Sequence, residues 1–366
     1  MILMNDFKSE PAELRTAMLN AMQRVLDSGW FVLGNEGTTF EAKWAAACGL
    51  NFGVGVGNGL DAIEITLRGL GIGPGDEVIT TPMTAFATVL AILRAGAKPV
   101  LADIEPESAL LSLQSARRCL GPATKAVLLV HLYGQVRNIK DWQKFCQKHN
   151  LYLLEDCAQA HGAMSDGQVA GSFGLAGAYS FYPTKNLGAL GDAGMLVTND
   201  ADLAERAATI RNYGQSIRYH HPELGMNSRL DELQAALLLE RLKWLPKFTA
   251  RRREIATQYN ENISNRFVKL LGHPKENSAH VYHLYVITCS QRQVLQAYLQ
   301  KNGVQALIHY PIPAHKQLPC THLKQDPQGL TVSETHADCC LSLPCHPQME
   351  DKDIQHIIEV VNSFKP

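Results

Sequence analysis

The chain has 366 residues, of which 46% are hydrophobic and 19% charged, and its formal net charge is -1. A chain so close to neutral has no electrostatic reason to bind a polyanion or an anionic membrane, so a nucleic-acid partner and a membrane partner are both disfavoured. The nine cysteines include no C-x-x-C pair and the first residues include no apolar stretch of signal-peptide length, a pattern typical of a cytoplasmic protein with reduced thiols.

Short apolar runs alternate with helical patterns from Leu50 to Val197. This rhythm predicts an α/β fold, in which a mostly parallel central sheet is flanked by helices. Helical spacing with polar faces appears between the runs, as in 85–95 and 141–149. The expected strands are 77–79, 99–102, 126–131, 151–155, 178–181 and 195–198.

The rhythm is lost after a long pattern rich in Leu and Ala, from Leu230 to Leu245, which we expect to be one helix. We place a domain boundary there, with a large domain over 1–245 and a smaller α+β domain over 246–366. The smaller domain is expected to contain a strand at 283–288 and helices at 292–301 and 352–364.

Lys185 lies where an apolar strand gives way to a polar, glycine-rich turn. A lysine held at a strand end can be desolvated enough to act as an amine nucleophile, although a lone lysine is more often a solvated loop residue. The other residues of the site therefore have to decide between these two roles of Lys185.

Asp156 follows the apolar run 151–155, at the presumed carboxyl end of a strand. Ligands of open α/β sheets bind at those ends, and an aspartate there can keep the pyridinium nitrogen of pyridoxal phosphate protonated. The structural alternative is an aspartate that caps a helix.

A glycine-rich segment, 53–62, leads into the helical run 63–70. Such a turn offers backbone N–H groups and a helix N-terminus to a phosphate. Its spacing also approaches a dinucleotide fingerprint, with Asp76 and Glu77 further on, so the glycines alone leave a nicotinamide cofactor open.

These residues resemble the DegT/DnrJ/StrS sugar aminotransferases, and the matching motifs run along nearly the whole chain. The motifs that carry the resemblance are SGWFVLG (28–34), GNGLDA (57–62), EDCAQAHG (155–162), SFYPTKNLG (180–188), RNYG (211–214), NSRLDELQAA (227–236), HYPIP (309–313) and SLP (342–344). The resemblance implies the aspartate-aminotransferase fold, pyridoxal-phosphate fold type I, with pyridoxal 5'-phosphate as the cofactor.

The resemblance also implies roles for individual residues. Lys185 would form the internal aldimine, a Schiff base, Asp156 would pair with the ring nitrogen, and Gln159 would lie against the ring near its hydroxyl. Ser180 with the backbone of Gly59 and Leu60 would hold the phosphate. Asn227 would reach the phosphate of the other subunit, which implies a homodimer with shared active sites.

One position departs from the family pattern. Ala85 stands where similar enzymes often carry an aromatic residue over the cofactor ring. Phe86 could replace that residue only in a different local register, and we expect it to be a core residue.

The candidates for binding the sugar nucleotide are weaker. Arginine suits phosphate oxygens, but Arg218 and Tyr219 could equally be a solvated surface pair. His131 and His161, near strand ends, could be ordinary hydrogen-bonded histidines, and the fourteen histidines show no zinc spacing, so we predict no metal site. The substrate-binding candidates are Arg218, Tyr219, Arg229, His309, Tyr310 and Lys316.

By resemblance, the chain would be an aminotransferase of EC class 2.6.1 that moves an amino group from an amino acid, glutamate, to a nucleotide-linked keto sugar. The motifs most resemble enzymes that aminate carbon 3 of a dTDP-3-keto-6-deoxyhexose, for O-antigen or other glycan biosynthesis. Amination at carbon 4 is the alternative within the family. From other classes, a nicotinamide-dependent oxidoreductase and a non-catalytic, regulatory pyridoxal-phosphate protein remain.

Overall fold

The computed structural model describes residues 1–366 and contains one large central sheet. Its strands are β1 (Phe52–Val56), β2 (Glu77–Thr80), β3 (Lys98–Leu101), β4 (Thr124–Val130), β5 (Tyr152–Asp156), β8 (Ala176–Ser180), β9 (Gly194–Thr198) and β12 (Lys324–Gln325). They follow the order β1-β9-β8-β5-β4-β2-β3-β12, in which only β9 runs antiparallel to its neighbours. The expected mostly parallel α/β sheet is confirmed.

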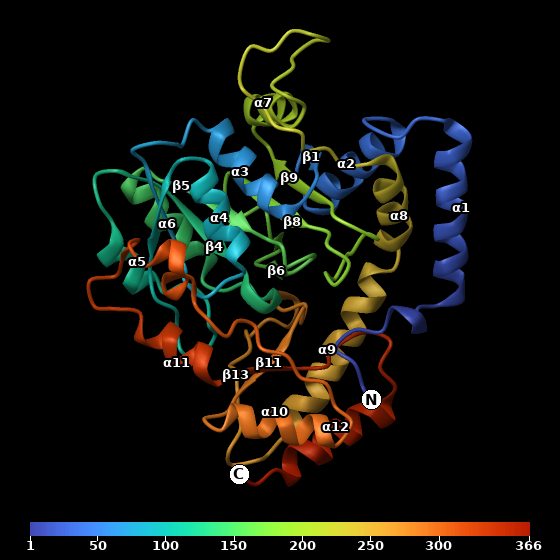
Figure 1. The fold of residues 1–366 in the computed structure, drawn as a ribbon, viewed down its shortest axis with the longest axis vertical. Helices are drawn as coiled ribbons and strands as arrows, with labels where there is room; N and C mark the ends of the chain where they lie inside the picture. The colour runs from blue at the N-terminus through green and yellow to red at the C-terminus, as the bar shows by residue number, and fades with distance from the viewer.

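Helices cover both faces of this sheet (Figure 1). They and the helices at its β1 edge are α1 (Ala12–Ser28), α2 (Asn35–Ala47), α3 (Gly59–Gly69), α4 (Phe86–Arg94), α5 (Leu113–Cys119), α6 (Ile139–His149), α7 (Ala201–Arg211) and α8 (Glu232–Leu242). Strand β4 shows why both faces need cover: Val127 and Leu129 enter one core cluster, while Ala126 and Leu128 enter another. Alternate side chains of a strand point to opposite faces, so a continuous apolar run becomes a strand buried on both sides.

The C-terminal part forms a second, smaller body below the sheet in Figure 1. It contains α9 (Leu245–Asn262), α10 (Arg292–Lys301), α11 (Thr331–Cys339), α12 (Asp351–Ser363) and the antiparallel strands β10 (Lys269–Leu270), β11 (Tyr285–Thr288) and β13 (Cys340–Leu343). A separate core cluster of 22 buried residues, all between Ile255 and Phe364, holds this part together.

The helix expected over 230–245 is divided in the structure. Helix α8 ends at Leu242, and α9 begins at Leu245 with Pro246 in its first turn. Proline has no N–H to donate to the preceding turn, so it suits a helix start and not a helix interior. The break separates the two bodies near residue 245, and the division into 1–245 and 246–366 stays a prediction.

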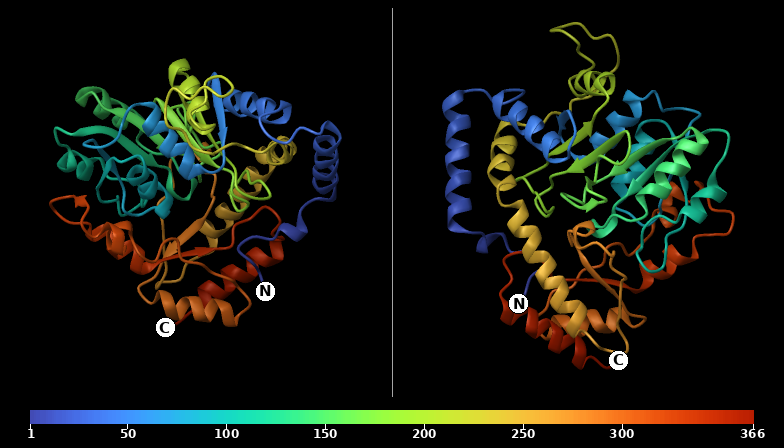
Figure 2. Two further views of the ribbon diagram at one scale, coloured as in Figure 1. Left: turned by 45° about the horizontal axis from the view of Figure 1, so that its top comes forward. Right: turned by 180° about the vertical axis from the view of Figure 1, so that it is seen from behind.

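Two segments cross that division. Strand β12 returns to the large sheet and pairs with β3, and the N-terminal segment pairs with the small body, where the Ile2 N–H donates to the Gly303 carbonyl at 2.7 Å. Helix α1 lies along α8 and α9 at the side of the molecule, as both views of Figure 2 show. A small hairpin of β6 (Met164–Ser165) and β7 (Gln168–Val169) completes the strands.

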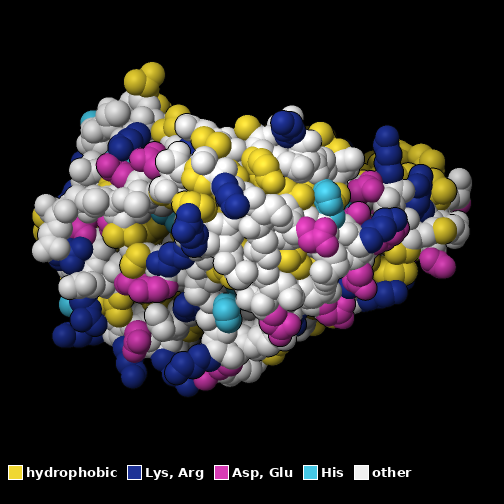
Figure 3. Space-filling model, turned by 90° about the horizontal axis from the view of Figure 1, so that it is seen from below, with side chains coloured by type: hydrophobic (Ala, Val, Ile, Leu, Met, Phe, Trp, Pro, Cys, Tyr) yellow, Lys and Arg dark blue, Asp and Glu magenta, His cyan; other side chains and the backbone are white.

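The surface of the small body carries charges of both signs close together (Figure 3). This mixture agrees with a formal net charge of -1. None of the helices combines the length and the apolar character needed to cross a bilayer.

Candidate active site

Lys185 lies on the loop that joins β8 to β9. Its N–H donates to the Tyr182 carbonyl at 2.8 Å, which closes a tight turn. The Asn186 side chain donates to the Val281 carbonyl at 3.0 Å and thereby ties the loop to the segment before β11. Burial lowers the pKa of Lys185 to about 8, although the carboxylate of Asp156 acts in the opposite direction. A buried amine with a lowered pKa is partly neutral at physiological pH and can act as a nucleophile or base.

Asp156 is the last residue of β5, directly beside Ala178 of β8. Its side chain is 7% exposed, and its Oδ2 accepts a hydrogen bond of 2.7 Å from the Thr88 hydroxyl. The chain continues in turns after Asp156, and no helix begins there, so the helix-cap interpretation is wrong. A fixed carboxylate near the Lys185 amine is the arrangement that a protonated pyridinium ring requires.

The start of α3 is the candidate phosphate cradle. Asn58 caps the helix by accepting from the Asp61 N–H at 2.8 Å, while the N–H groups of Gly59 and Leu60 have no partner within the chain. A Cβ atom on Gly59 would lie 2.7 Å from the Cβ of Ser180, so only glycine lets the helix start this close to the Ser180 hydroxyl. Free N–H groups at a helix N-terminus beside a hydroxyl fit a phosphate group.

The earlier glycines of the same run have another role. Gly53 and Gly55 belong to β1, where added Cβ atoms would lie 2.6 Å from the Glu41 carbonyl oxygen and 2.8 Å from the Leu230 Cβ. They are therefore glycines because β1 is closely packed, so the phosphate-binding turn expected within 53–62 does not include them, and a phosphate contact at Gly59 and Leu60 stays a prediction. This observation also weakens the dinucleotide interpretation.

Gln159, His309 and Tyr310 come together beside this centre. The Gln159 Nε2 donates to the Tyr310 hydroxyl at 3.2 Å, although the two residues are far apart in the sequence. Burial lowers the pKa of His309 to about 4, and the Lys185 amine adds a smaller effect in the same direction. His309 and Tyr310 thus approach the Lys185 and Asp156 centre from the C-terminal part.

The other substrate-binding candidates form no hydrogen bond or ion pair with Lys185, Asp156 or Gln159. Arg218 and Tyr219 are exposed on the loop that projects beyond α7 (Figure 1), with the guanidinium 5.0 Å from the Tyr219 ring centroid. Arg229 donates to the Asn212 side chain at 3.2 Å, and Lys316 forms an ion pair of 3.0 Å with Glu334. Their role toward a substrate stays a prediction.

Asn227 is also exposed, and its backbone bridges to Asn212. Its predicted contact would reach a second subunit, so it too stays a prediction.

Ala85 immediately precedes α4 and offers only a methyl group. Phe86 packs against an apolar cluster that includes Val89, Leu101 and Leu330. Phe86 is therefore a core residue, as expected, and α4 brings no aromatic ring toward Asp156.

The two histidines beside strand ends differ. His131 bonds to Glu155 at 2.8 Å, as an ordinary core histidine does. His161 is fully buried among the rings of Trp44, Tyr179 and Phe181, and neither of its ring nitrogens has a hydrogen-bond partner. The expectation of an ordinary hydrogen-bonded histidine is therefore wrong for His161.

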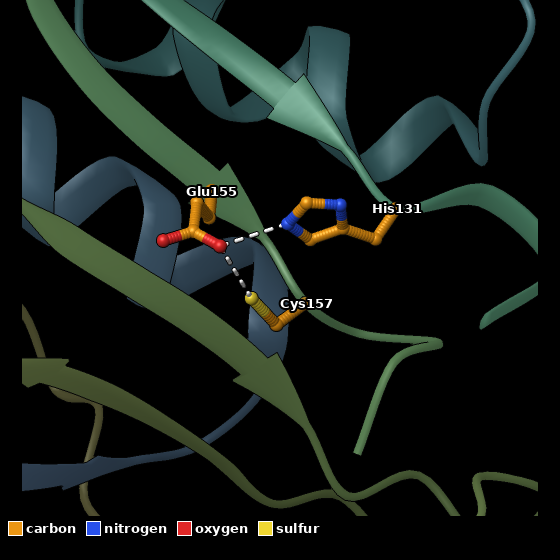
Figure 4. A group of neighbouring side chains, drawn as sticks. All are labelled: His131, Glu155 and Cys157. Atoms are coloured by element: carbon orange, nitrogen blue, oxygen red, sulfur yellow. Dashed lines mark hydrogen bonds and ion pairs between the residues drawn. The ribbon is translucent and has the colours of Figure 1, made fainter. Parts of the chain in front are cut away.

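His131, Glu155 and Cys157 converge in the core (Figure 4). Both carboxylate oxygens of Glu155 already accept hydrogen bonds, including backbone N–H groups of Gly171 at 2.7 Å and Phe173 at 2.8 Å. A carboxylate saturated in this way serves to fix the loop after β7 to the end of β5, next to Asp156.

Sequence reasoning missed the residues that support the centre from other elements. Thr88 lies on α4 and bonds Asp156, and Tyr133 donates its N–H to the Gln159 Oε1 at 2.6 Å. Tyr133 has a positive φ of 62°, a backbone conformation that the sequence does not signal for tyrosine. Only Asn186, inside the SFYPTKNLG motif, had a local signal.

Lys185, Asp156 and the cradle at Gly59 thus define a pyridoxal-phosphate-dependent enzyme built on an α/β sheet. Comparison with known proteins agrees, since the model of the DegT/DnrJ/EryC1/StrS aminotransferase family matches residues 12–362. The chain belongs to this family, and its cofactor is pyridoxal phosphate.

The curated relatives match over their full length. The chain is 43% identical over 364 residues to the dTDP-3-amino-3,6-dideoxy-alpha-D-galactopyranose transaminase of Aneurinibacillus thermoaerophilus, with 100% of this chain and 99% of the relative covered. It is 40% identical over 363 residues to a pleiotropic regulatory protein of Geobacillus stearothermophilus, with 99% and 98% covered.

The fold is also similar to that of a solved structure of a related protein. DesV from S. venezuelae, solved as a complex with a ketimine intermediate, superposes with a TM-score of 0.95 at 38% identity, with 99% of this chain and 97% of DesV covered.

Proposed function

We propose that this chain transfers an amino group from an amino acid, L-glutamate, to carbon 3 of a nucleotide-linked keto sugar, a dTDP-3-keto-6-deoxyhexose. The observation that carries the proposal is the partly buried Lys185 amine, which lies on the loop after β8 and senses the charge of Asp156 at the end of β5. The names of full-length relatives supply the substrate class, because several are transaminases of dTDP-3-amino sugars.

The residues divide the work as follows. Bound pyridoxal phosphate supplies an electron-withdrawing ring that stabilises negative charge on the carbon of the donor. Asp156 holds the ring nitrogen protonated, and Thr88 and the Ala158 N–H fix the orientation of its carboxylate. The Gly59 and Leu60 N–H groups with Ser180 hold the phosphate. Lys185, as a neutral amine, would take the proton from the α-carbon of the donor and, as the ammonium group that results, deliver it to the cofactor carbon that carries the transferred nitrogen.

A homodimer with shared active sites supports this reaction. Large apolar side chains are exposed on loops of the large body. Trp30, between α1 and α2, is 62% exposed, and Ile217, between α7 and α8, is 65% exposed. Exposed apolar groups of this size favour burial against another surface. Arg218, Tyr219 and Asn227 of one subunit would then meet the cofactor phosphate and the sugar diphosphate bound by the other.

Subunit complementation tests the shared site. Lys185→Ala and Asn227→Ala chains, each impaired alone, are mixed under conditions that exchange subunits. A mixed dimer contains one site in which both residues are native, so random pairing restores about a quarter of the native activity. Mixing that restores nothing while exchange is verified would contradict shared sites.

The regulatory name of the Geobacillus relative favours a second candidate, a pyridoxal-phosphate protein with a regulatory role. The two functions are separated by one half-reaction. A catalytic protein converts glutamate to its keto acid in one equivalent per site, with loss of the visible cofactor band, whereas a binding protein does not.

The decisive experiment combines the purified holoenzyme, glutamate and a panel of dTDP- and UDP-linked 3-keto and 4-keto sugars. NMR then locates the new C–N bond. We expect nitrogen on carbon 3 of a dTDP-linked sugar; nitrogen on carbon 4 would replace the proposed regiochemistry by the 4-amino alternative.

A further inference from the structure

The side-chain amide of Gln159 is fixed at both ends. Its Oε1 accepts from the Tyr133 N–H at 2.6 Å, and its Nε2 donates to the Tyr310 hydroxyl at 3.2 Å. A backbone N–H can only donate, so the atom facing Tyr133 has to be the amide oxygen. The amide is therefore held in one orientation, and one Nε2 hydrogen is left over.

Tyr310 links this amide to the C-terminal part of the chain. Burial raises the pKa of Tyr310 to about 12, and the Asp156 carboxylate adds to the effect. The phenol therefore stays protonated and offers its oxygen to Gln159. The Tyr133 hydroxyl donates to the carbonyl of His309, the neighbour of Tyr310, at 2.6 Å. Tyr133 thus contacts both the segment of Tyr310 and the Oε1 of Gln159.

No comparable support comes from α4. Ala85 presents a methyl group, and Phe86 packs away into the core. Among the aromatic side chains, Tyr310 is the one hydrogen-bonded to Gln159, which is itself 5% exposed and three residues beyond Asp156.

We infer that Tyr310 is a positioning residue that acts on the cofactor through Gln159. By orienting the amide, it directs the free Nε2 hydrogen of Gln159 toward the ring hydroxyl of pyridoxal phosphate. This inference rests on the proposed function and on the place against the cofactor ring that the family resemblance implies for Gln159. The C-terminal part of the chain would thus influence the protonation of the cofactor. Helix α4 provides no aromatic ring that could do so.

The test compares holoenzymes of native protein and Tyr310→Phe by titrating the visible absorbance of the bound cofactor with pH. Tyr310→Phe removes the hydrogen bond between Gln159 and the Tyr310 hydroxyl. This loss should shift the midpoint of the absorbance titration by about 0.5–1 pH unit and lower kcat/KM by about 3- to 10-fold. In a Gln159→Ala background, Tyr310→Phe should add almost nothing, because the two changes interrupt the same path.

Tyr285→Phe is the matched control. Tyr285 lies in the same part of the chain and donates its hydroxyl to the Asn260 side-chain amide at 2.8 Å, but it has no contact with Gln159. We expect an unchanged midpoint for this variant.

Three outcomes would overturn the inference: an equal shift in Tyr285→Phe, additive effects of the Tyr310 and Gln159 changes, or an unchanged midpoint with only a raised KM for the sugar. Failure of the proposed function is distinguishable, because the native protein itself would then show no visible band when the vitamin is supplied, or would keep the band and fail to convert glutamate to its keto acid.

Discussion

The two sides of the active site are held in different ways. On the side of the large sheet, Asp156 and Lys185 stand at the ends of neighbouring buried strands, and their positions follow from local backbone structure. On the side of the small body, His309 and Tyr310 lie on an irregular segment that is held by contacts with Tyr133, Gln159 and Ser342. In the proposed function the sheet side would carry the proton transfer and the contact with the ring nitrogen, whereas the small body would only adjust them. Substitutions on the two sides should therefore differ in size.

Lys185→Ala should have the largest effect. Removal of the amine that transfers the proton should lower turnover at least ~1,000-fold, with an unchanged urea unfolding midpoint for the cofactor-free protein. Appreciable turnover by the purified variant would end the assignment of Lys185.

The next test is how the reactivity of the Lys185 amine depends on pH. An amine reacts with acylating reagents when it is neutral, and the pKa of Lys185 is lowered from 10.5 to about 8. In cofactor-free protein the labelling rate of Lys185 should rise with pH and level off above the pKa near 8. At pH 7 the neutral fraction of Lys185 should be ~300-fold larger than that of a solvated lysine, and its labelling rate should be larger accordingly. Mass spectrometry of Lys185 and of exposed Lys352 in the same sample makes the comparison internal. Equal profiles would show that Lys185 is solvated.

Glu155→Gln should destabilise the sheet side without touching the cofactor. The Glu155 carboxylate accepts from His131 and from the N–H groups of Gly171, Phe173 and Gly174, and an amide NH2 would face donors instead. We expect a loss of about 2–4 kcal/mol in the free energy of unfolding, measured in urea. Native stability in the variant would mean that the loop after β7 is held by other contacts.

Gly59→Ala should weaken cofactor binding. The added methyl would lie 2.7 Å from the Ser180 Cβ, so α3 has to shift away from the hydroxyl that lines the cradle. An overpacking penalty of about 1–3 kcal/mol corresponds to roughly 5- to 150-fold weaker binding of pyridoxal phosphate, measured by absorbance titration. Gly71→Ala is a control with open space around the new methyl but a positive φ of 71°, and it should change stability and not cofactor affinity.

Phe86→Leu should have the smallest effect. Phe86 is partly buried against an apolar cluster, so the change should lower stability by ~1 kcal/mol and leave the cofactor spectrum unaltered. An altered spectrum would indicate that Phe86 contacts the cofactor ring after all.

Local sequence determined much of this molecule by itself. The runs 151–155 and 178–181 are too apolar for any element but buried strands, and a strand delivers the residue that follows it to the edge of the sheet. The place of Asp156 at the end of a strand and the mostly parallel α/β class of the fold could therefore be predicted from the order of residues, whereas the roles of Asp156 and Lys185 were implied by the family resemblance. The family motifs added the cofactor.

Only the tertiary structure decided the rest. Gly53 and Gly55 look like a phosphate turn in the sequence, yet packing against Glu41 and Leu230 explains them. The bonds from Thr88 to Asp156 and from Tyr310 to Gln159 join residues 68 and 151 positions apart. Periodicity reports only the neighbours within one helix or strand, so contacts across such separations are fixed by how separate elements of the fold pack.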